Sequence, residues 1–161
     1  MAAVRTHYLD ASAIVKLFVD EENSDILRNY YNDHSTYSTT SLCFSEAIGA
    51  LKVKWLYRKE ITHEQYLDAM NDLMACFSYE SIRIDEIEIK DRNVFKEVER
   101  LSECYALDIS DAFQIYTLKK GFFSVFEGDS KPILITGDTK LADATRQEGL
   151  RVWDCMKEPV P

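Results

Sequence analysis

YLDASAIVKLF, residues 8–18, is the stretch from which the fold prediction starts. Residues 4–9 are expected to form a first strand, and residues 12–19 are expected to form a helix with a broad apolar face. Asp10 lies at the junction between these two elements. An aspartate at a strand-to-helix junction most often caps the helix, so Asp10 taken alone is interpreted as a cap.

Strands and helices continue to alternate along the chain. The apolar run PILIT, residues 132–136, is typical of a strand buried on both faces of a parallel sheet. Thr62 and Gln65 form a capping box at the start of a helix. This alternation predicts an α/β domain with a mostly parallel sheet. Further strands are predicted at 36–38, 81–84 and 150–153, and further helices at 23–32, 41–59, 62–77, 87–105, 109–120 and 138–147.

Length and composition indicate one soluble domain spanning residues 1–161. The apolar fraction of 46% is sufficient for a hydrophobic core in a chain of 161 residues. No stretch approaches the roughly 20 apolar residues of a membrane helix, and the N-terminus lacks the layout of a signal peptide. We therefore expect a cytoplasmic protein. Its four cysteines contain no CxxC pair, which argues against a structural zinc site.

The chain is acidic, with a formal net charge of −9. This charge argues against broad, nonspecific binding of duplex nucleic acid, where contacts between cations and phosphates dominate affinity. It does not exclude a nucleic-acid substrate, because acidic residues can gather around metal ions that reverse the local charge.

Four carboxylates are placed by these predictions at one edge of the sheet. Asp10 and Asp138 end predicted strands, Glu46 lies one turn inside a largely apolar helix, and Asp111 lies near a helix start. Open parallel sheets gather working groups at the carboxyl ends of their strands. Each residue also has a plainer interpretation. Asp10 and Asp138 can be caps, Asp111 can favour a helix N-terminus, and Glu46 can be solvated, although its apolar neighbours argue against full exposure.

Convergence of the four side chains would require a counter-charge. Carboxylates held close together repel one another and become partly protonated. Oxygen ligands of this kind favour Mg²⁺ or Mn²⁺ over zinc, and no histidine lies near the four in the sequence. Asp108, three residues before Asp111, is interpreted as the helix cap. Asp143 is expected to lie to one side of the crevice.

At this point the chain resembles the PIN domain family. The resemblance rests on LDASAIVKLF (9–18), SLCFSEAIGAL (41–51), LDISDAFQIY (107–116), LITGDTKLADAT (134–145) and VWD (152–154), in the order and spacing of the family. It implies a three-layer, Rossmann-like α/β/α sandwich and a Mg²⁺- or Mn²⁺-dependent ribonuclease. Family members of this size are most often toxins of type II toxin–antitoxin pairs, of the VapC kind. Such toxins are homodimers joined by a helical hairpin and inhibited by a small antitoxin.

The expected catalytic and metal-binding set is therefore Asp10, Glu46, Asp111 and Asp138. Asp10 and Asp138 are assigned as metal ligands, Asp111 as a bridge or ligand of a second ion, and Glu46 as a ligand or as the residue that orients the attacking water. Two metal ions would clamp the attacking and leaving oxygens of a phosphodiester, but one ion is also compatible with the sequence. Ser12 and Thr136 are expected either to bond the carboxylates or phosphate, or to make ordinary turn and cap bonds.

One segment departs from the family pattern, namely GFFSVFEGDSK at residues 121–131. Its apolar side chains are expected beside the active-site edge, either packed into the core or forming a lip that stacks bases or binds a partner. A basic stripe on the long helix is interpreted as a solvated face or as a contact for the RNA backbone. The stripe comprises Lys52, Lys54, Arg58 and Lys59.

Four alternatives to a toxin nuclease are considered, and two of them lack the motif that they require. One is a catalytically silent interaction module, and another is a PIN nuclease of RNA processing or DNA metabolism. A hydrolase with an aspartyl nucleophile would need a second Asp at position 12, which is Ser12. A dinucleotide-binding domain would need GxGxxG after the first strand, and that motif is absent.

Overall fold

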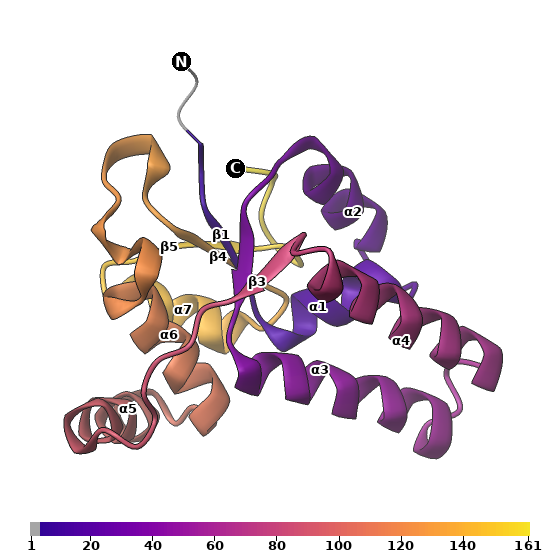
Figure 1. Cartoon of the computed structure of the whole chain (residues 1–161), viewed down its shortest axis with the longest axis horizontal. Helices are drawn as coiled ribbons and strands as arrows, with labels where there is room; N and C mark the ends of the chain where they lie inside the picture. The colour runs from indigo at the N-terminus through magenta and orange to yellow at the C-terminus, as the bar shows by residue number, and fades with distance from the viewer. Residues whose placement is uncertain (1–3) are drawn as a thin grey trace.

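A central five-stranded parallel sheet organises the computed structural model, which describes residues 4–161 (Figure 1). The strand order is β3-β2-β1-β4-β5, and every neighbouring pair is parallel. This arrangement confirms the predicted α/β class, with β1 at the centre of the sheet. The strands are β1 (His7–Leu9), β2 (Tyr37–Thr39), β3 (Ile82–Ile84), β4 (Ile133–Thr136) and β5 (Arg151–Asp154).

Helices cover both faces of the sheet and produce the three-layer sandwich. Leu9 and Ile135 pack on one face with helices α1 to α4, whereas Tyr8 and Leu134 pack on the other with α5 to α7. Alternate residues of β1 and β4 therefore enter separate cores, as expected for strands buried on both faces. The helices are α1 (Ala11–Phe18), α2 (Ser24–Asp33), α3 (Ser41–Lys52), α4 (His63–Ser78), α5 (Arg92–Tyr105), α6 (Ile109–Lys120) and α7 (Thr139–Gln147).

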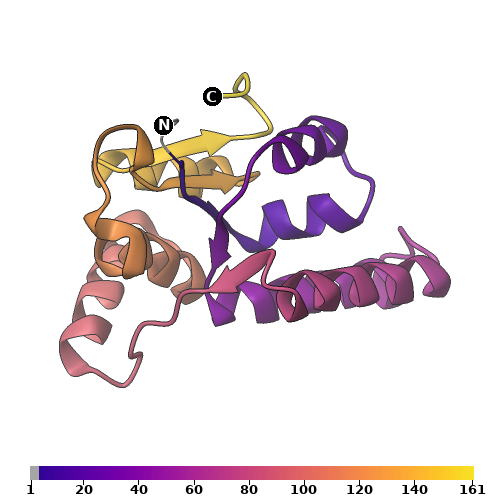
Figure 2. The same cartoon turned by 45° about the horizontal axis from the view of Figure 1, so that its top comes forward.

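Helices α3 and α4 form a hairpin that extends beyond the edge of the sheet (Figure 2). The capping box predicted at its second helix is present, because the Thr62 and Gln65 side chains each bond the other's backbone nitrogen. The first helix is shorter than predicted. Regular α-helix ends at Lys52, and a π-helical turn, Val53–Tyr57, follows it.

The start of α5 also differs from the prediction. Residues 87–91 were assigned to the helix, but the helix begins at Arg92. Asp91 caps it, since its carboxylate accepts hydrogen bonds from the backbone nitrogens of Asn93 and Val94 at 2.7 and 3.2 Å. A side-chain acceptor at this point satisfies the first free N–H groups of the helix.

The segment at 121–131 lies partly away from the predicted position. It follows the last turn of α6, whereas Asp111 lies in the first turn, and a helix of 12 residues separates its ends by roughly 18 Å. Its distal part approaches the start of the sheet, where Asp129 lines a hollow together with Arg5. The expectation that these apolar residues border the carboxyl edge is therefore wrong for the distal part, whereas Phe122 lies beside the end of β3, its backbone nitrogen donating to Asp85 Oδ2 at 3.1 Å. Within residues 4–161, no helix is both long and apolar enough to cross a membrane.

Candidate functional site

Asp10 is buried at the point where β1 meets α1, with 3% of its surface exposed. Its Oδ1 accepts a hydrogen bond from the Ala13 backbone nitrogen at 2.8 Å, so it does cap the helix. Its carboxylate also accepts bonds from Ser12 Oγ at 2.8 Å and from Thr136 Oγ1 at 2.7 Å. The same side chain therefore satisfies the helix and joins the ends of two neighbouring strands.

Asp138 begins α7 directly beyond β4. Its Oδ1 accepts bonds from the backbone nitrogens of Lys140 and Leu141 at 2.8 and 3.2 Å, which makes it a helix cap as well. Its own backbone nitrogen donates to Thr136 Oγ1 at 2.9 Å. One threonine hydroxyl therefore connects Asp10 with the backbone of Asp138.

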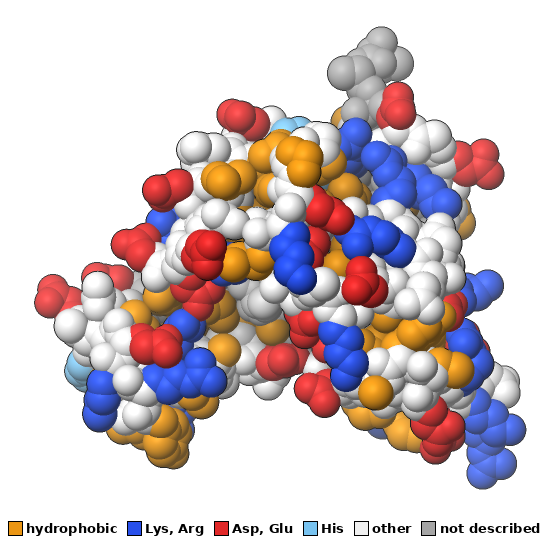
Figure 3. Space-filling view, turned by 180° about the vertical axis from the view of Figure 1, so that it is seen from behind, with side chains coloured by type: hydrophobic (Ala, Val, Ile, Leu, Met, Phe, Trp, Pro, Cys, Tyr) orange, Lys and Arg blue, Asp and Glu red, His pale blue; other side chains and the backbone are white. Residues whose placement is uncertain are grey.

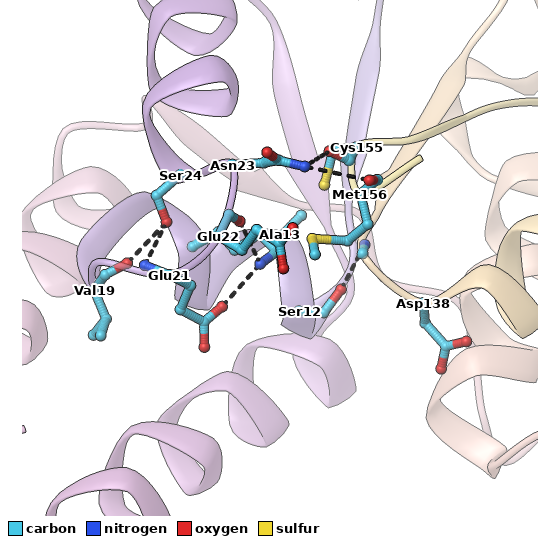
Figure 4. A network of polar contacts seen from close by, with 12 residues as sticks. Ser12, Ala13, Val19, Glu21, Glu22, Asn23, Ser24, Asp138, Cys155 and Met156 are labelled. Atoms are coloured by element: carbon cyan, nitrogen blue, oxygen red, sulfur yellow. Dashed lines mark hydrogen bonds and ion pairs between the residues drawn. The ribbon is translucent and has the colours of Figure 1, made fainter. Parts of the chain in front are cut away.

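Ser12 forms a second connection between these loops. Its Oγ accepts a hydrogen bond from the Gly137 backbone nitrogen at 2.8 Å, as Figure 4 shows beside Asp138. A side chain at position 137 would begin 3.0 Å from Lys16 Cε and 3.3 Å from Ser12 Oγ, so the close approach favours glycine. Both predicted roles of Ser12 and Thr136 are observed, since each hydroxyl donates to the Asp10 carboxylate and also accepts a hydrogen bond from a backbone nitrogen of the turn after β4.

Asp111 and Glu46 come from helices on opposite faces of the sheet. Asp111 lies half-buried in the first turn of α6, and Glu46 lies in α3. The Ser110 hydroxyl donates to Glu46 Oε2 at 2.6 Å, which joins the starts of the two helices. Glu46 is exposed, so the expectation that its apolar neighbours would partly bury it is wrong. Phe44 and Ile48 face the core instead.

Two of the four carboxylates have raised pKa values, to which the charges of the others contribute. Burial raises the pKa of Asp10 to about 6, an effect that its hydrogen bonds partly offset and the charge of Asp138 increases. Burial also raises the pKa of Asp111 to about 7, with further contributions from Asp10, Glu46 and Asp138. Carboxylates that raise one another's pKa values are close enough to repel. Asp and Glu side chains are visible at the notch between the two helical lobes (Figure 3).

The donor chemistry of this edge suits a hard divalent cation. Carboxylate oxygens are the ligands that Mg²⁺ and Mn²⁺ prefer, and a cation would relieve the repulsion at Asp111. Within residues 4–161, however, no three His, Cys, Asp or Glu side chains are already arranged to hold one ion. Glu46 is exposed and would complete a site by rotating its side chain, whereas Asp138 would contribute Oδ2 while Oδ1 stays in the cap of α7.

The two neighbouring aspartates behave differently from each other. Asp108 occupies the N-cap position of α6, as predicted, and its carbonyl accepts a bond from the Ala112 nitrogen at 3.0 Å, although its side chain makes no capping hydrogen bond. Its charge also raises the pKa of Asp111. Asp143 is exposed and pairs with Arg146 at 3.2 Å, in agreement with its expected place to one side.

Two buried polar side chains near this edge were not among the predicted residues. Asp154 ends β5, is 1% exposed, and accepts bonds from Thr139 Oγ1 and the Met156 nitrogen at 2.9 and 3.0 Å. Gln114 is fully buried in α6, one turn beyond Asp111, and its amide donates to the Leu9 carbonyl at 3.4 Å. Asp154 could have been predicted from its position at the end of a strand, which is the criterion that identified Asp10 and Asp138.

Several basic side chains in α1 and on the α3–α4 hairpin form ion pairs with carboxylates. Lys16 Nζ lies 3.1 Å from Glu21 Oε2, and Lys54 Nζ lies 2.5 Å from Glu21 and 2.7 Å from Glu60. Arg58 also lies near Glu60, at 3.8 Å. Much of the basic stripe is thus paired with carboxylates, which favours its interpretation as an ordinary helix surface.

Comparison with known proteins supports the fold. No family model matches the chain, and no curated protein matches it. Among solved structures, the chain is similar to the crystal structure of PAE2754 from Pyrobaculum aerophilum, with 21% sequence identity and a TM-score of 0.57. The match covers 92% of this chain and 91% of that chain. This likeness extends over nearly the whole sandwich and concerns the fold alone.

Proposed function

We propose that this protein is a Mg²⁺- or Mn²⁺-dependent ribonuclease that hydrolyses phosphodiester bonds at the carboxylate edge. The observation that carries the proposal is the hydrogen bonding at this edge, where Thr136 connects Asp10 with Asp138 and Ser110, next to Asp111, bonds Glu46. Folding alone does not require carboxylates from α1, α3, α6 and α7 to lie at one edge of the sheet. A bound divalent cation would neutralise these carboxylates and so account for the arrangement.

The roles of the residues follow from their positions. Bound Mg²⁺ or Mn²⁺ would supply an acidified water and neutralise charge on the phosphate. Asp10, held by Thr136, Ser12 and the Ala13 nitrogen, provides a fixed carboxylate. Asp111 provides a second carboxylate on the α6 side.

The two exposed carboxylates complete the arrangement from opposite sides. Glu46 in α3 is exposed and can adjust towards a cation or its water ligands, whereas Asp138 would offer Oδ2, because its Oδ1 caps α7. Glu46 is held only by Ser110, and a bond of this kind to an exposed side chain is easily exchanged for water. We therefore assign Glu46 to orienting the attacking water or to a metal, and Asp138 to a metal.

The test is RNA cleavage by purified protein with Mg²⁺ or Mn²⁺, compared with the same protein in EDTA. We expect cleavage in the presence of the metal and none after chelation. Asp143→Asn is a matched control, because it removes an exposed aspartate of α7 that is paired with Arg146. Equal cleavage by Asp10→Asn and wild type would refute the proposal.

We further propose that the protein acts in the cytoplasm as the toxin of a toxin–antitoxin pair. The family resemblance supports this role, with a homodimer formed through the α3–α4 hairpin. That hairpin exposes Tyr57, Leu67 and Met74, at 72%, 46% and 46%. A small gene next to this one, whose product co-purifies with the protein and blocks cleavage, is the expected finding.

A catalytically silent interaction module is the second candidate. It is favoured by the observation that no three potential ligands within residues 4–161 are already arranged around one ion. Calorimetric titration with Mn²⁺ separates the two candidates. The nuclease requires binding at millimolar metal or below, whereas the silent module requires none.

A further inference from the structure

The turn that follows α6 exposes aromatic surface that the core does not use. It consists of the 3-10 turn η2 (Phe122–Val125) and Phe126. Phe123 is buried beneath it against Tyr8, whereas Phe122 and Val125 are 73% and 76% exposed. Burial of Phe123 is enough to anchor the turn, so packing does not explain the exposed ring of Phe122.

A hollow of about 300 Å³ lies beside this turn, and three of its nine lining residues are lysines. Lys119 and Lys120 come from the last turn of α6, and Lys131 comes from the end of the 121–131 segment. The Ser124 hydroxyl and the side chain of Glu148 complete its polar lining. We call this hollow, together with Phe122, the lysine pocket.

The charges of the lysine pocket favour an anion. Glu148 is already held by Lys119 at 2.6 Å and by Arg100 at 3.2 Å, and these partners lower its pKa to about 2. Lys120 and Lys131 have no ion pair within residues 4–161. The pocket therefore carries an excess of positive charge in a chain whose net charge is −9.

Lysines in the last turn of a helix can be explained by the helix dipole, which accounts for Lys119 and Lys120. It does not account for Lys131, which lies outside the helix. The combination of unpaired lysines with an exposed ring matches the way single-stranded nucleic acid is held, by contacts to phosphates and by base stacking.

The geometry points to a second RNA-binding site: the lysine pocket binds a phosphate of single-stranded RNA while a base stacks on Phe122. This inference rests on the proposed ribonuclease function, since it names how the substrate is held away from the cleaved bond. Helix α6 connects the two places, with Asp111 in its first turn and Lys120 in its last. A strand that occupies both therefore spans roughly 14 Å along the helix.

The test measures binding separately from cleavage. Labelled single-stranded RNA of about 20 nucleotides is titrated in EDTA with Asp10→Asn protein, and affinity is read by fluorescence anisotropy. In that background Lys120→Glu with Lys131→Glu is expected to weaken binding about tenfold. Phe122→Ala is expected to weaken it about fivefold. The Lys120→Glu/Lys131→Glu variant should also show a slope of log affinity against log salt that is shallower by about 1.4.

Lys59→Glu is the matched control, because Lys59 is exposed near the tip of the α3–α4 hairpin, on the other side of the molecule (Figure 1). It should leave affinity within about twofold of the background protein, as a distant exposed charge is largely screened. An equal loss from Lys59→Glu would reduce the effect to net charge and overturn the inference. Unchanged affinity in both the Lys120→Glu/Lys131→Glu variant and Phe122→Ala would overturn it as well.

Cleavage distinguishes this inference from the proposed function. With active protein, a dinucleotide substrate is too short to extend from Asp111 to the lysine pocket, roughly 14 Å away along α6. The Lys120→Glu/Lys131→Glu variant should therefore cleave the dinucleotide at the wild-type rate and cleave the longer RNA more slowly. Equal slowing on both substrates would overturn the inference. Lysine-dependent binding without any cleavage by wild type would uphold the second site and refute the ribonuclease.

Discussion

The two ends of β1 present buried titratable groups in opposite settings. His7 begins the strand and Asp10 follows its last residue, and both side chains are at most 3% exposed. His7 lies in an aromatic cluster, where Nε2 lies 3.0 Å from the Tyr30 hydroxyl and the ring stacks on Tyr37 at 4.8 Å. Asp10 instead lies next to other carboxylates.

Burial shifts both groups towards their neutral forms. It lowers the pKa of His7 to about 4 and raises the pKa of Asp10 to about 6. Like charges add to the shift at both ends, since His34 and Arg5 further lower the pKa of His7 and Asp138 further raises that of Asp10. The two ends differ in ligand chemistry, because His7 is surrounded by aromatic rings and cations, whereas Asp10 offers carboxylate oxygen, the ligand that Mg²⁺ and Mn²⁺ prefer.

The largest expected effect is on catalysis at the Asp10 end. Asp10→Asn, Asp111→Asn and Asp138→Asn should each reduce metal-dependent RNA cleavage by more than about a hundredfold, since loss of outer-shell partners alone costs 10- to 100-fold. His7→Gln should retain cleavage within about threefold at a temperature where it is folded. A loss in His7→Gln as great as that in Asp10→Asn would remove the contrast between the two ends.

The next effect concerns acid stability at the His7 end. Because the pKa of His7 is about 4 when folded and 6.5 in the reference state, the unfolded chain binds the proton first. Stability is fully present above pH 6.5 and is lost as the pH falls towards 4, by about 3 kcal/mol. Urea unfolding of wild type and His7→Gln at several pH values measures this. The two curves should converge at low pH, and parallel curves would contradict the assignment.

A smaller effect is expected from the hydroxyl that connects Asp10 with β4. Thr136→Val keeps the shape of the side chain but removes the bonds to Asp10 and from the Asp138 nitrogen. Cleavage should fall about tenfold, in the range for residues that orient a ligand. Thr136→Ser is the matched control and should recover most of the rate. An unchanged Mn²⁺ dependence in Thr136→Val would show that the hydroxyl only supports the fold.

The smallest expected effect is a gain in stability. The folded state holds Asp10 with a pKa of about 6, above its reference value of 3.8, so ionising it above pH 6 opposes folding. In EDTA at pH 7.5, Asp10→Asn should therefore be more stable than wild type by on the order of 1 kcal/mol. The gain should vanish near pH 4. A variant that is less stable at pH 7.5 would mean that capping outweighs repulsion.

Much of the sandwich was predictable because its strands carry their own signals. The apolar run at Ile133–Thr136 and the aspartates after two strands placed the sheet and one edge of it. The start of α5 was missed because residues 87–91 continue the apolar spacing of a helix, while the capping bonds of Asp91 decide where it begins. Local spacing does not reveal which carboxylate satisfies the first free nitrogens.

The interior of the site was less accessible to prediction. The exposure of Glu46 depends on how α3 rotates against the sheet, and the lack of a capping bond from the Asp108 side chain depends on side-chain conformation. The distal part of the 121–131 segment was misplaced although its position follows from topology. A helix that starts at the carboxyl edge of a parallel sheet delivers the chain to the opposite edge. The missed signal was therefore the direction of α6, and the lysine pocket lies where that helix ends.

The measurement closest to the central claim is a calorimetric titration of Mn²⁺ into wild-type protein and into Asp10→Asn. We predict saturable binding at millimolar metal or below in wild type and its loss in Asp10→Asn, with Asp143→Asn behaving like wild type. No binding by wild-type protein, or equal binding by Asp10→Asn, would contradict the claim that these carboxylates form a metal site.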